Sequence, residues 1–291
     1  MTRQMRANFL LVLTAMIWGA AFVAQDVAAE GVPPFAFNGL RMALAAAALV
    51  PVVWVKGRKK QTSDSKTLLQ GGIACGVMLA LGSAFQQLGI TMGTGAGKAG
   101  FITALYIVLV PLTGIFFGRR LGRLVWAAVA LSAAGLYLLC MKGSLAVDPG
   151  DGMLILCALS YTGHILVVDH FSRRVDCLKM SCIQFAVCAL LCLACAAVFE
   201  KPTWEGVSAN MVSIVYAGVF SGAVGYTLQI IAQRDAEPTV ASLIMSLESV
   251  FAVLSGWIIL GDFLSARELC GCLLMLGGIV LAQLPGKTSE E

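Results

Sequence analysis

Charged side chains are scarce in this sequence. Asp, Glu, Lys and Arg make up 12% of its 291 residues, about half of the share that soluble domains carry. Hydrophobic residues make up 59%, and the mean hydropathy is +0.87. This composition excludes a pair of soluble domains, which the length alone would allow. The net charge of +4 does not indicate a nucleic-acid partner, because the basic residues lie in the short breaks between apolar runs.

Catalytic and metal-binding motifs are also missing. The chain has only 2 histidines, and it contains no H-E-x-x-H, G-x-S-x-G or paired-aspartate protease motif. Its 10 cysteines lie mostly inside the apolar runs, where small packing residues are a better interpretation than metal ligands or redox pairs. We therefore expect no cofactor, no metal and no enzymatic activity.

A nucleotide-binding motif is not supported either. Residues 95–100 match G-x-G-x-x-G, but no strand precedes them and no βαβ unit follows. They also fail as a P-loop, since Ala99 stands where Ser or Thr belongs. This argues against a primary pump. Glycines at four-residue spacing instead predict close approach between helices, at Gly72 and Gly76 and at Gly218 and Gly222.

The sequence has many long apolar runs. Each is about 20 residues long, enough to cross a hydrocarbon core of about 30 Å as a helix. The first run is too long for the apolar core of a signal peptide, so we interpret it as a membrane helix. We predict an all-α polytopic membrane protein with ten spans, at residues 8–27, 34–55, 68–89, 94–117, 124–141, 151–168, 178–199, 211–231, 238–260 and 268–284.

The distribution of basic residues predicts the orientation. Most of the 20 Lys and Arg residues fall in breaks on the same side as the N-terminus, and such an excess marks the cytoplasmic side. We therefore expect an integral plasma-membrane protein with both termini in the cytoplasm, and a bacterial cytoplasmic membrane fits this pattern.

The two halves of the chain resemble each other. Sliding the second half back by about 143 positions aligns them without gaps, which predicts repeats at residues 1–143 and 144–291. Five spans per half is an odd number, so the second copy must enter the membrane from the opposite side. Such inverted repeats place a substrate site near the midplane, between the halves. Matched pairs include Trp18 and Tyr161, Asp26 and Asp169, Gly82 and Gly225, Gln86 and Gln229, and Gly135 and Gly278.

Several motifs resemble the EamA-type members of the drug/metabolite transporter superfamily. They are Trp18-Gly19, residues 41–45, residues 97–106 leading to Pro111, residues 246–252, Gly256-Trp257 and Gly261-Asp262. The resemblance covers nearly the whole chain. It implies ten helices in a five-plus-five arrangement, a central cavity, and transport of amino acids, other metabolites or drugs, often outward.

The sequence also departs from the family pattern. Arg119 stands where the family usually has Glu after the fourth span, and Val250 stands where it usually has Pro in the ninth. The family usually has Gly-Glu just after both of these spans, and here only Gly261-Asp262 keeps an acid. We therefore assign no role to the acidic residues of this motif.

Charges inside spans cost at least about 2.5 kcal/mol each at the bilayer centre, so they indicate function. Glu248 lies near the middle of the ninth span, where it either exchanges a proton or is tied to a neighbouring helix. Through the repeat it corresponds to Leu105, which lies seven residues, or two helical turns, from Lys98. We therefore expect Lys98 and Glu248 to face one cavity. Lys98 would bind a substrate carboxylate, pair with an acid or reach the surface.

Three further sets of charged or titratable residues are candidates. Arg41, in the second span, either binds a ligand or is tied to an acid or to carbonyl groups. His164, in the sixth span, either titrates or packs as a hydrogen-bonded core residue. The repeat partners Asp26 and Asp169 lie at span ends on opposite membrane sides, where they suit either gates or ordinary water-facing helix ends.

Uncharged candidates follow from the repeat and from the aromatic positions. Gln86 and Gln229 either bind substrate or hydrogen-bond between helices. Four aromatic residues either form walls of a substrate site or pack in the core, and they are Trp18, Tyr106, Tyr161 and Tyr226.

Together these features predict a secondary transporter that exports a small metabolite, either amino-acid-like or an organic anion, by alternating access. The alternative is a proton-coupled exporter of cationic drugs or other organic cations. A channel is disfavoured because the spans show no repeated charged ring, and an intramembrane enzyme because the catalytic motifs are missing. The expected partners are a small-molecule substrate and the lipid bilayer, without nucleic acid, and a monomer is compatible with this prediction.

Overall fold

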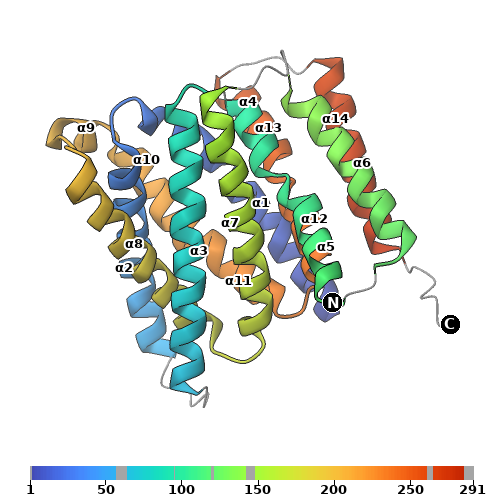
Figure 1. Ribbon diagram of the computed structural model, residues 1–291, viewed down its shortest axis with the longest axis horizontal. Helices are drawn as coiled ribbons and strands as arrows, with labels where there is room; N and C mark the ends of the chain where they lie inside the picture. The colour runs from blue at the N-terminus through green and yellow to red at the C-terminus, as the bar shows by residue number, and fades with distance from the viewer. Residues whose placement is uncertain are drawn as a thin grey trace.

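The chain folds into one helical bundle in the computed structural model (Figure 1). The structure describes residues 2–56, 64–94, 96–118, 121–141, 148–260 and 265–284, and these contain no β-strand. Within them, 10 helical segments are long and apolar enough to cross a membrane. The predicted all-α fold with ten spans is confirmed. The Gly261-Asp262 motif and Arg119 lie outside the described residues.

The helix boundaries match the expected spans to within a few residues. Polar caps explain several of them: Asp64 and Asp176 accept backbone N–H bonds at the starts of α3 and α8. In chain order the elements are α1 (Arg3–Ala29), α2 (Pro34–Lys56), α3 (Ser65–Thr91), α4 (Ala96–Thr103), α5 (Tyr106–Phe116), α6 (Arg123–Cys140), α7 (Pro149–Ser172), α8 (Cys177–Phe199), α9 (Trp204–Ala209), α10 (Met211–Val215), the π-helix η1 (Tyr216–Tyr226), α11 (Thr227–Gln233), α12 (Pro238–Met245), α13 (Glu248–Leu260) and α14 (Ala266–Gln283).

The fourth and ninth spans are interrupted, which the sequence did not lead us to expect. The fourth is split into α4 and α5 at Ala104 and Leu105, and the ninth into α12 and α13 at Ser246 and Leu247. Ser246 follows Ala104 by 142 positions, close to the repeat offset. At both breaks the backbone switches to bonds spanning three residues, such as Leu105 N to Ile102 O and Leu247 N to Ile244 O. These 3₁₀-like turns mark a hinge-like feature present in both halves.

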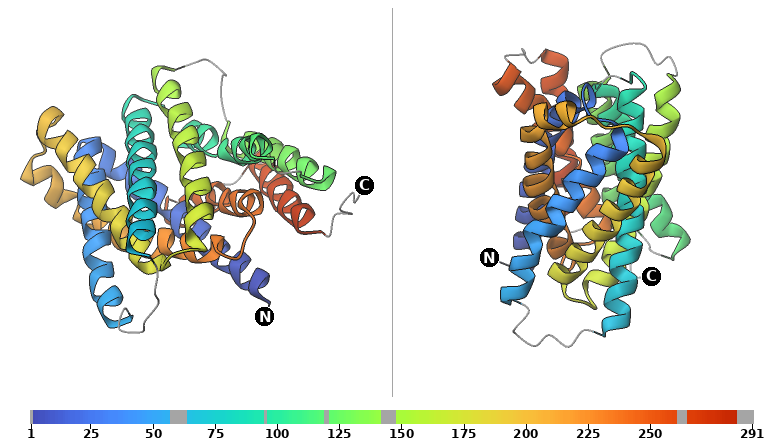
Figure 2. Two further views of the ribbon diagram at one scale, coloured as in Figure 1. Left: turned by 60° about the horizontal axis from the view of Figure 1, so that its bottom comes forward. Right: turned by 90° about the vertical axis from the view of Figure 1, so that its left-hand side faces the viewer.

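The contacts between helices follow the repeat: a pair of helices in contact has a counterpart when each helix is replaced by its equivalent in the other half. The most extensive contacts are α6 with α14, α3 with α7, and α2 with α8. In Figure 1, the α2–α8 pair and the α6–α14 pair lie at opposite sides of the bundle, and Figure 2 keeps α6 beside α14. Contacts of α1 with α13 match those of α7 with α4 and α5. This pairing fits two inverted five-helix repeats.

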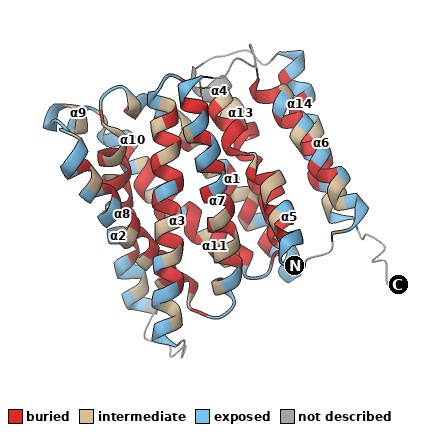
Figure 3. Ribbon diagram, in the orientation of Figure 1, coloured by how far each residue is buried: buried red, intermediate tan, exposed pale blue. Residues whose placement is uncertain are grey.

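Close helix approach depends on glycine at several positions. A Cβ on Gly135 of α6 would lie 2.7 Å from the carbonyl oxygen of Gly271 in α14. The predicted close approaches also occur within the fold, because Gly72 and Gly76 face α8 while Gly218 and Gly222 face α2. Figure 3 shows buried positions along the inner helix faces and exposed ones around the outside. Many of the exposed residues are large and apolar, which suits contact with lipid.

Candidate functional site

A central cavity lies between the two halves of the bundle. Its volume is about 40 Å³, and it is lined from α1, α2, α3, α4, α5, α7, η1, α11, α12 and α13. The structure places nine of the ten predicted binding residues in its wall, and they are Trp18, Arg41, Gln86, Tyr106, Tyr161, His164, Tyr226, Gln229 and Glu248.

The two helix breaks meet in this cavity. Tyr106 is the first residue of α5 and Glu248 the first of α13. The Tyr106 hydroxyl donates a 3.0 Å hydrogen bond to Oε1 of Glu248, and both side chains are buried. No basic side chain pairs with Glu248 in the described part of the chain. The carboxyl group therefore accepts a hydrogen bond from a neutral donor. Because it lines the cavity, it can bind a ligand or take up a proton.

Arg41, on α2, places a positive charge in the cavity wall. Its side chain is 2% exposed, and its guanidinium carbon lies 5.4 Å from the ring centroid of Phe37. Its Nε donates a 2.8 Å hydrogen bond to Oδ1 of Asn38, whose amide is fixed by the carbonyl oxygen of Ser83 at 3.0 Å. Among the described residues, no carboxylate pairs with Arg41. Its two terminal nitrogens can therefore receive a carboxylate in a bidentate geometry.

An aromatic cluster forms another part of the wall, and Tyr226 is at its centre. The Tyr226 ring lies 4.6 Å from the Trp18 ring and 5.8 Å from the His164 ring, between centroids. Its hydroxyl is 3.4 Å from the Tyr161 hydroxyl. The indole Nε1 of Trp18 donates to the carbonyl oxygen of Ser221 at 3.2 Å. These bonds orient the rings, so the wall offers apolar faces with hydroxyl groups at their edges.

Two repeat-related glycines seat two repeat-related aromatic rings. A Cβ on Gly225 would lie 2.7 Å from Nε1 of Trp18, and a Cβ on Gly82 would lie 3.0 Å from the ring of Tyr161. Any larger residue would have to displace a ring that the other half contributes to the cavity wall. The repeat thus builds the same ring-on-glycine contact twice, each time between the two halves.

His164 and the glutamines supply neutral polar groups. His164 Nε2 lies 3.1 Å from Oε1 of Gln184, so the imidazole is tied to α8 while it lines the cavity. Gln229 donates to Oε1 of Gln233 at 2.9 Å, and its own Oε1 has no hydrogen-bond partner among the described residues. Oε1 of Gln25, also in the cavity wall, is equally without a partner there. Such buried acceptors suit a ligand or water that donates hydrogen bonds.

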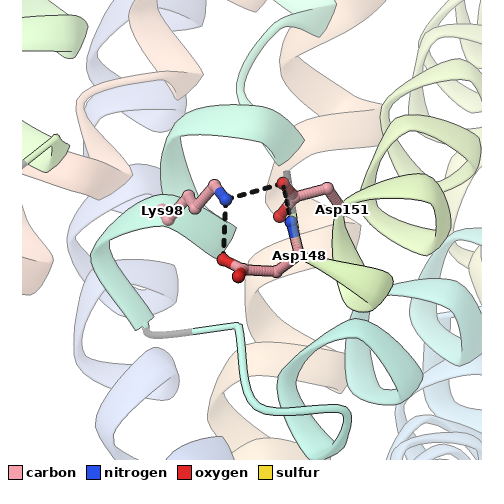
Figure 4. Close-up of polar contacts among 3 residues, drawn as sticks. All are labelled: Lys98, Asp148 and Asp151. Carbon is pink, nitrogen blue, oxygen red and sulfur yellow. Dashed lines mark hydrogen bonds and ion pairs between the residues drawn. The ribbon is translucent and has the colours of Figure 1, made fainter. Parts of the chain in front are cut away.

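Lys98 does not lie in the cavity wall, contrary to our expectation. Its ammonium contacts Oδ2 of Asp148 at 2.7 Å and Oδ2 of Asp151 at 2.6 Å, at the start of α7 (Figure 4). The expectation assumed one continuous helix from Lys98 to Leu105. Because α4 ends at Thr103, the break changes the helical register between them. Lys98 therefore links the first half to the second instead of facing Glu248.

The two aspartates predicted as gates also lie outside the cavity wall. Asp26 is exposed near the end of α1. Asp169 is buried near the end of α7, where Nη2 of Arg173 lies 3.4 Å from its Oδ1. Each lies near the end of its own helix, as the repeat predicts, and the gating role of the pair stays a prediction.

Comparison with known proteins settles the family. The model of the EamA-like transporter family matches residues 5–141 and again residues 148–284. The chain belongs to the EamA-like transporter family. A protein of Archaeoglobus fulgidus named as an uncharacterized transporter is 28% identical over 284 residues, 97% of this chain and 87% of that protein. The inner membrane transporter YedA of Escherichia coli is 24% identical, over 92% of this chain and 86% of its own.

A solved structure shares the fold of this EamA-like protein. The two superpose with a TM-score of 0.81, covering 96% of this chain and 98% of the other, at 19% sequence identity. The superposition supports the fold alone. The family match, the relatives named as transporters and the apolar helical segments make the protein an integral membrane transporter. Within the described residues, no group of three His, Cys, Asp or Glu side chains is placed to hold a metal ion.

Sequence reasoning missed several members of the site. Phe22 and Gln25 line the cavity with Trp18, and they follow it by four and seven residues on one face of α1. That spacing could have identified them. Glu200, outside the cavity, was also missed. Its two carboxylate oxygens accept 2.8 Å bonds from the backbone N–H groups of Phe35 and Ala36, so the end of α8 is tied to the start of α2.

Proposed function

We propose that this EamA-like transporter exports a zwitterionic or anionic metabolite, amino-acid-like in its charged groups, by alternating access. One observation carries the substrate class: the buried guanidinium of Arg41 lines the cavity and has no carboxylate partner among the described residues. A buried cation without an anion is costly, so the site is suited to a ligand that brings one.

Each wall has a distinct part in binding. A substrate carboxylate would form paired hydrogen bonds with Arg41. A substrate ammonium would lie near Glu248, or that carboxyl would take up a proton instead. The side chain of the substrate would pack on Tyr226 and Trp18, whose centroids lie 4.6 Å apart. The same aromatic face accepts cationic as well as apolar groups.

Two contacts between the halves close one end of the cavity in the proposed alternating-access cycle. The contact of Lys98 with Asp151 and the contact of Glu200 with the start of α2 both lie at the end where α4 and α7 begin. With the N-terminus in the cytoplasm, as the basic residues predict, this end faces outward. We propose that both links hold the outer end closed during loading. The Lys98 contact then separates as the cavity opens outward, while α5 and α13 pivot at their breaks.

A second candidate is a proton-coupled exporter of organic cations. Glu248 favours it, because a buried carboxyl near aromatic rings suits a cation as well as a proton. The two candidates differ in whether Arg41 or Glu248 recognises the substrate.

A flux assay decides between them. The purified protein in liposomes is loaded with a labelled panel of amino acids, organic anions and hydrophobic cations, with and without a pH gradient. The proposal predicts flux of compounds that carry a carboxylate. Flux restricted to cations would replace it with the second candidate, and no flux of any panel member would contradict both substrate classes.

Orientation has its own test. Fusion of a reporter active only in the cytoplasm to the C-terminus, and separately to the loop after Cys140, should give signal only from the C-terminal fusion. The reverse pattern would place the Lys98 contact on the inner side and would contradict export as described.

A further inference from the structure

A second cleft lies at the end of the bundle opposite Lys98, and it is rich in arginine. Its volume is about 260 Å³. Arg3 and Arg6 enter from the first turns of α1, and Arg234 from the turn after α11. Leu10 and Ile231 supply an apolar wall. The cleft is therefore built from both halves of the chain and combines guanidinium groups with apolar surface.

The charge of the cleft is unbalanced. Three arginines face one carboxylate, that of Asp235. No ion pair or hydrogen bond is recorded for the side chains of Arg3, Arg6 or Arg234 within the described ranges. Guanidinium groups match the geometry of phosphate oxygens and are weakly hydrated. The cleft therefore suits a phosphate-bearing anion.

The surroundings favour a lipid over a free anion. Leu10 and Ile231, which line the cleft beside the arginines, are partly exposed. The cleft lies at the ends of two membrane-spanning segments, Arg3–Ala29 and Met211–Gln233, where phospholipid headgroups reach. A headgroup at the arginines and acyl chains against Leu10 and Ile231 would satisfy both parts of this surface. A free phosphate would use only the arginines.

We propose that this cleft binds the phosphate headgroup of an anionic phospholipid. The bound lipid bridges α1 of the first half and the turn between α11 and α12 of the second half. It therefore stabilises the contact between the halves at this end. This inference is independent of the transported substrate.

The test is lipid binding to the purified full-length protein in mild detergent. Native mass spectrometry compares phosphatidylglycerol with phosphatidylcholine, and inorganic phosphate and glycerol phosphate are tested separately. Two net positive charges near a lipid phosphate correspond to about a 30-fold preference for the anionic lipid. The variant with Arg3→Gln, Arg6→Gln and Arg234→Gln should lose that preference.

A matched control removes the same charge elsewhere. Lys66, Arg123 and Arg174 are exposed basic residues near the same end and outside the cleft, and their replacement by Gln should leave the preference intact. Equal loss in both variants, equal binding of the two lipids, or saturation by inorganic phosphate at the same concentrations as lipid would overturn the proposal. Thermal unfolding of both variants without added lipid shows whether each is folded.

Discussion

The hydroxyl of Tyr106 donates a 3.0 Å hydrogen bond to Oε1 of Glu248, and these residues begin the two helices that follow the breaks in the fourth and ninth spans. One bond thus joins the hinge of the first half to the hinge of the second. Because both side chains are buried in the cavity wall, a ligand or a proton at Glu248 acts directly on this connection.

Removing the donor should loosen that connection without removing the carboxyl group. Tyr106→Phe keeps the ring and leaves Glu248 without its recorded hydrogen-bond donor. Thermal unfolding in detergent should show a loss of about 1 kcal/mol, the usual size of such bonds inside membranes. Tyr216→Phe is the control, because that hydroxyl donates to the carbonyl oxygen of Ile17 outside the cavity wall. Equal flux in wild type and Tyr106→Phe would contradict a role for the bond in transport.

Removing the titratable group should separate binding from proton coupling. Glu248→Gln keeps an oxygen that accepts the Tyr106 bond but cannot exchange a proton. Flux in liposomes should lose its response to an imposed pH gradient while exchange at equal pH continues. If the pH-gradient response persists in Glu248→Gln, the carboxyl group is not the coupling site.

Breaking the Lys98 contact should open the end of the bundle where α4 and α7 begin. Lys98→Gln leaves the buried carboxylate of Asp151 without this cation. Hydrogen–deuterium exchange over residues 148–154 should become severalfold faster, and Lys66→Gln serves as a control at the opposite end. Unchanged exchange in Lys98→Gln would show that the contact does not hold this end closed.

Filling a glycine that seats an aromatic ring should disturb the cavity wall. Gly225→Ala places a Cβ 2.7 Å from Nε1 of Trp18, and such overpacking costs about 1–3 kcal/mol. Tryptophan fluorescence should shift and the unfolding temperature should fall. Gly152→Ala is the matched control, because no atom outside its own helix backbone and chain neighbours lies within 4 Å of its Cβ position. An unshifted spectrum in Gly225→Ala would show that Trp18 does not depend on this contact.

Much of the fold could be predicted, because apolar length and the repeat are visible in the sequence. The repeat also identified residues such as Gln86 and Gln229, which do line the cavity. The breaks could not be predicted, since Ala104-Leu105 and Ser246-Leu247 contain neither Pro nor Gly. They arise from a local change in hydrogen-bond pattern. That change also explains the wrong prediction for Lys98. The seven-residue spacing from Lys98 to Leu105 puts both on one face only if the helix is continuous, and it is broken between them.

The substrate prediction depends most directly on Arg41. The decisive measurement compares flux of an amino acid with flux of the amine that lacks its carboxylate, in wild type, Arg41→Lys and Arg41→Gln. We predict that Arg41→Gln lowers amino-acid flux at least about tenfold, the effect of losing about 1.4 kcal/mol of binding. Arg41→Lys should retain part of that flux, and amine flux should change little. Equal reduction of both compounds, or no reduction of either, would contradict carboxylate recognition by Arg41.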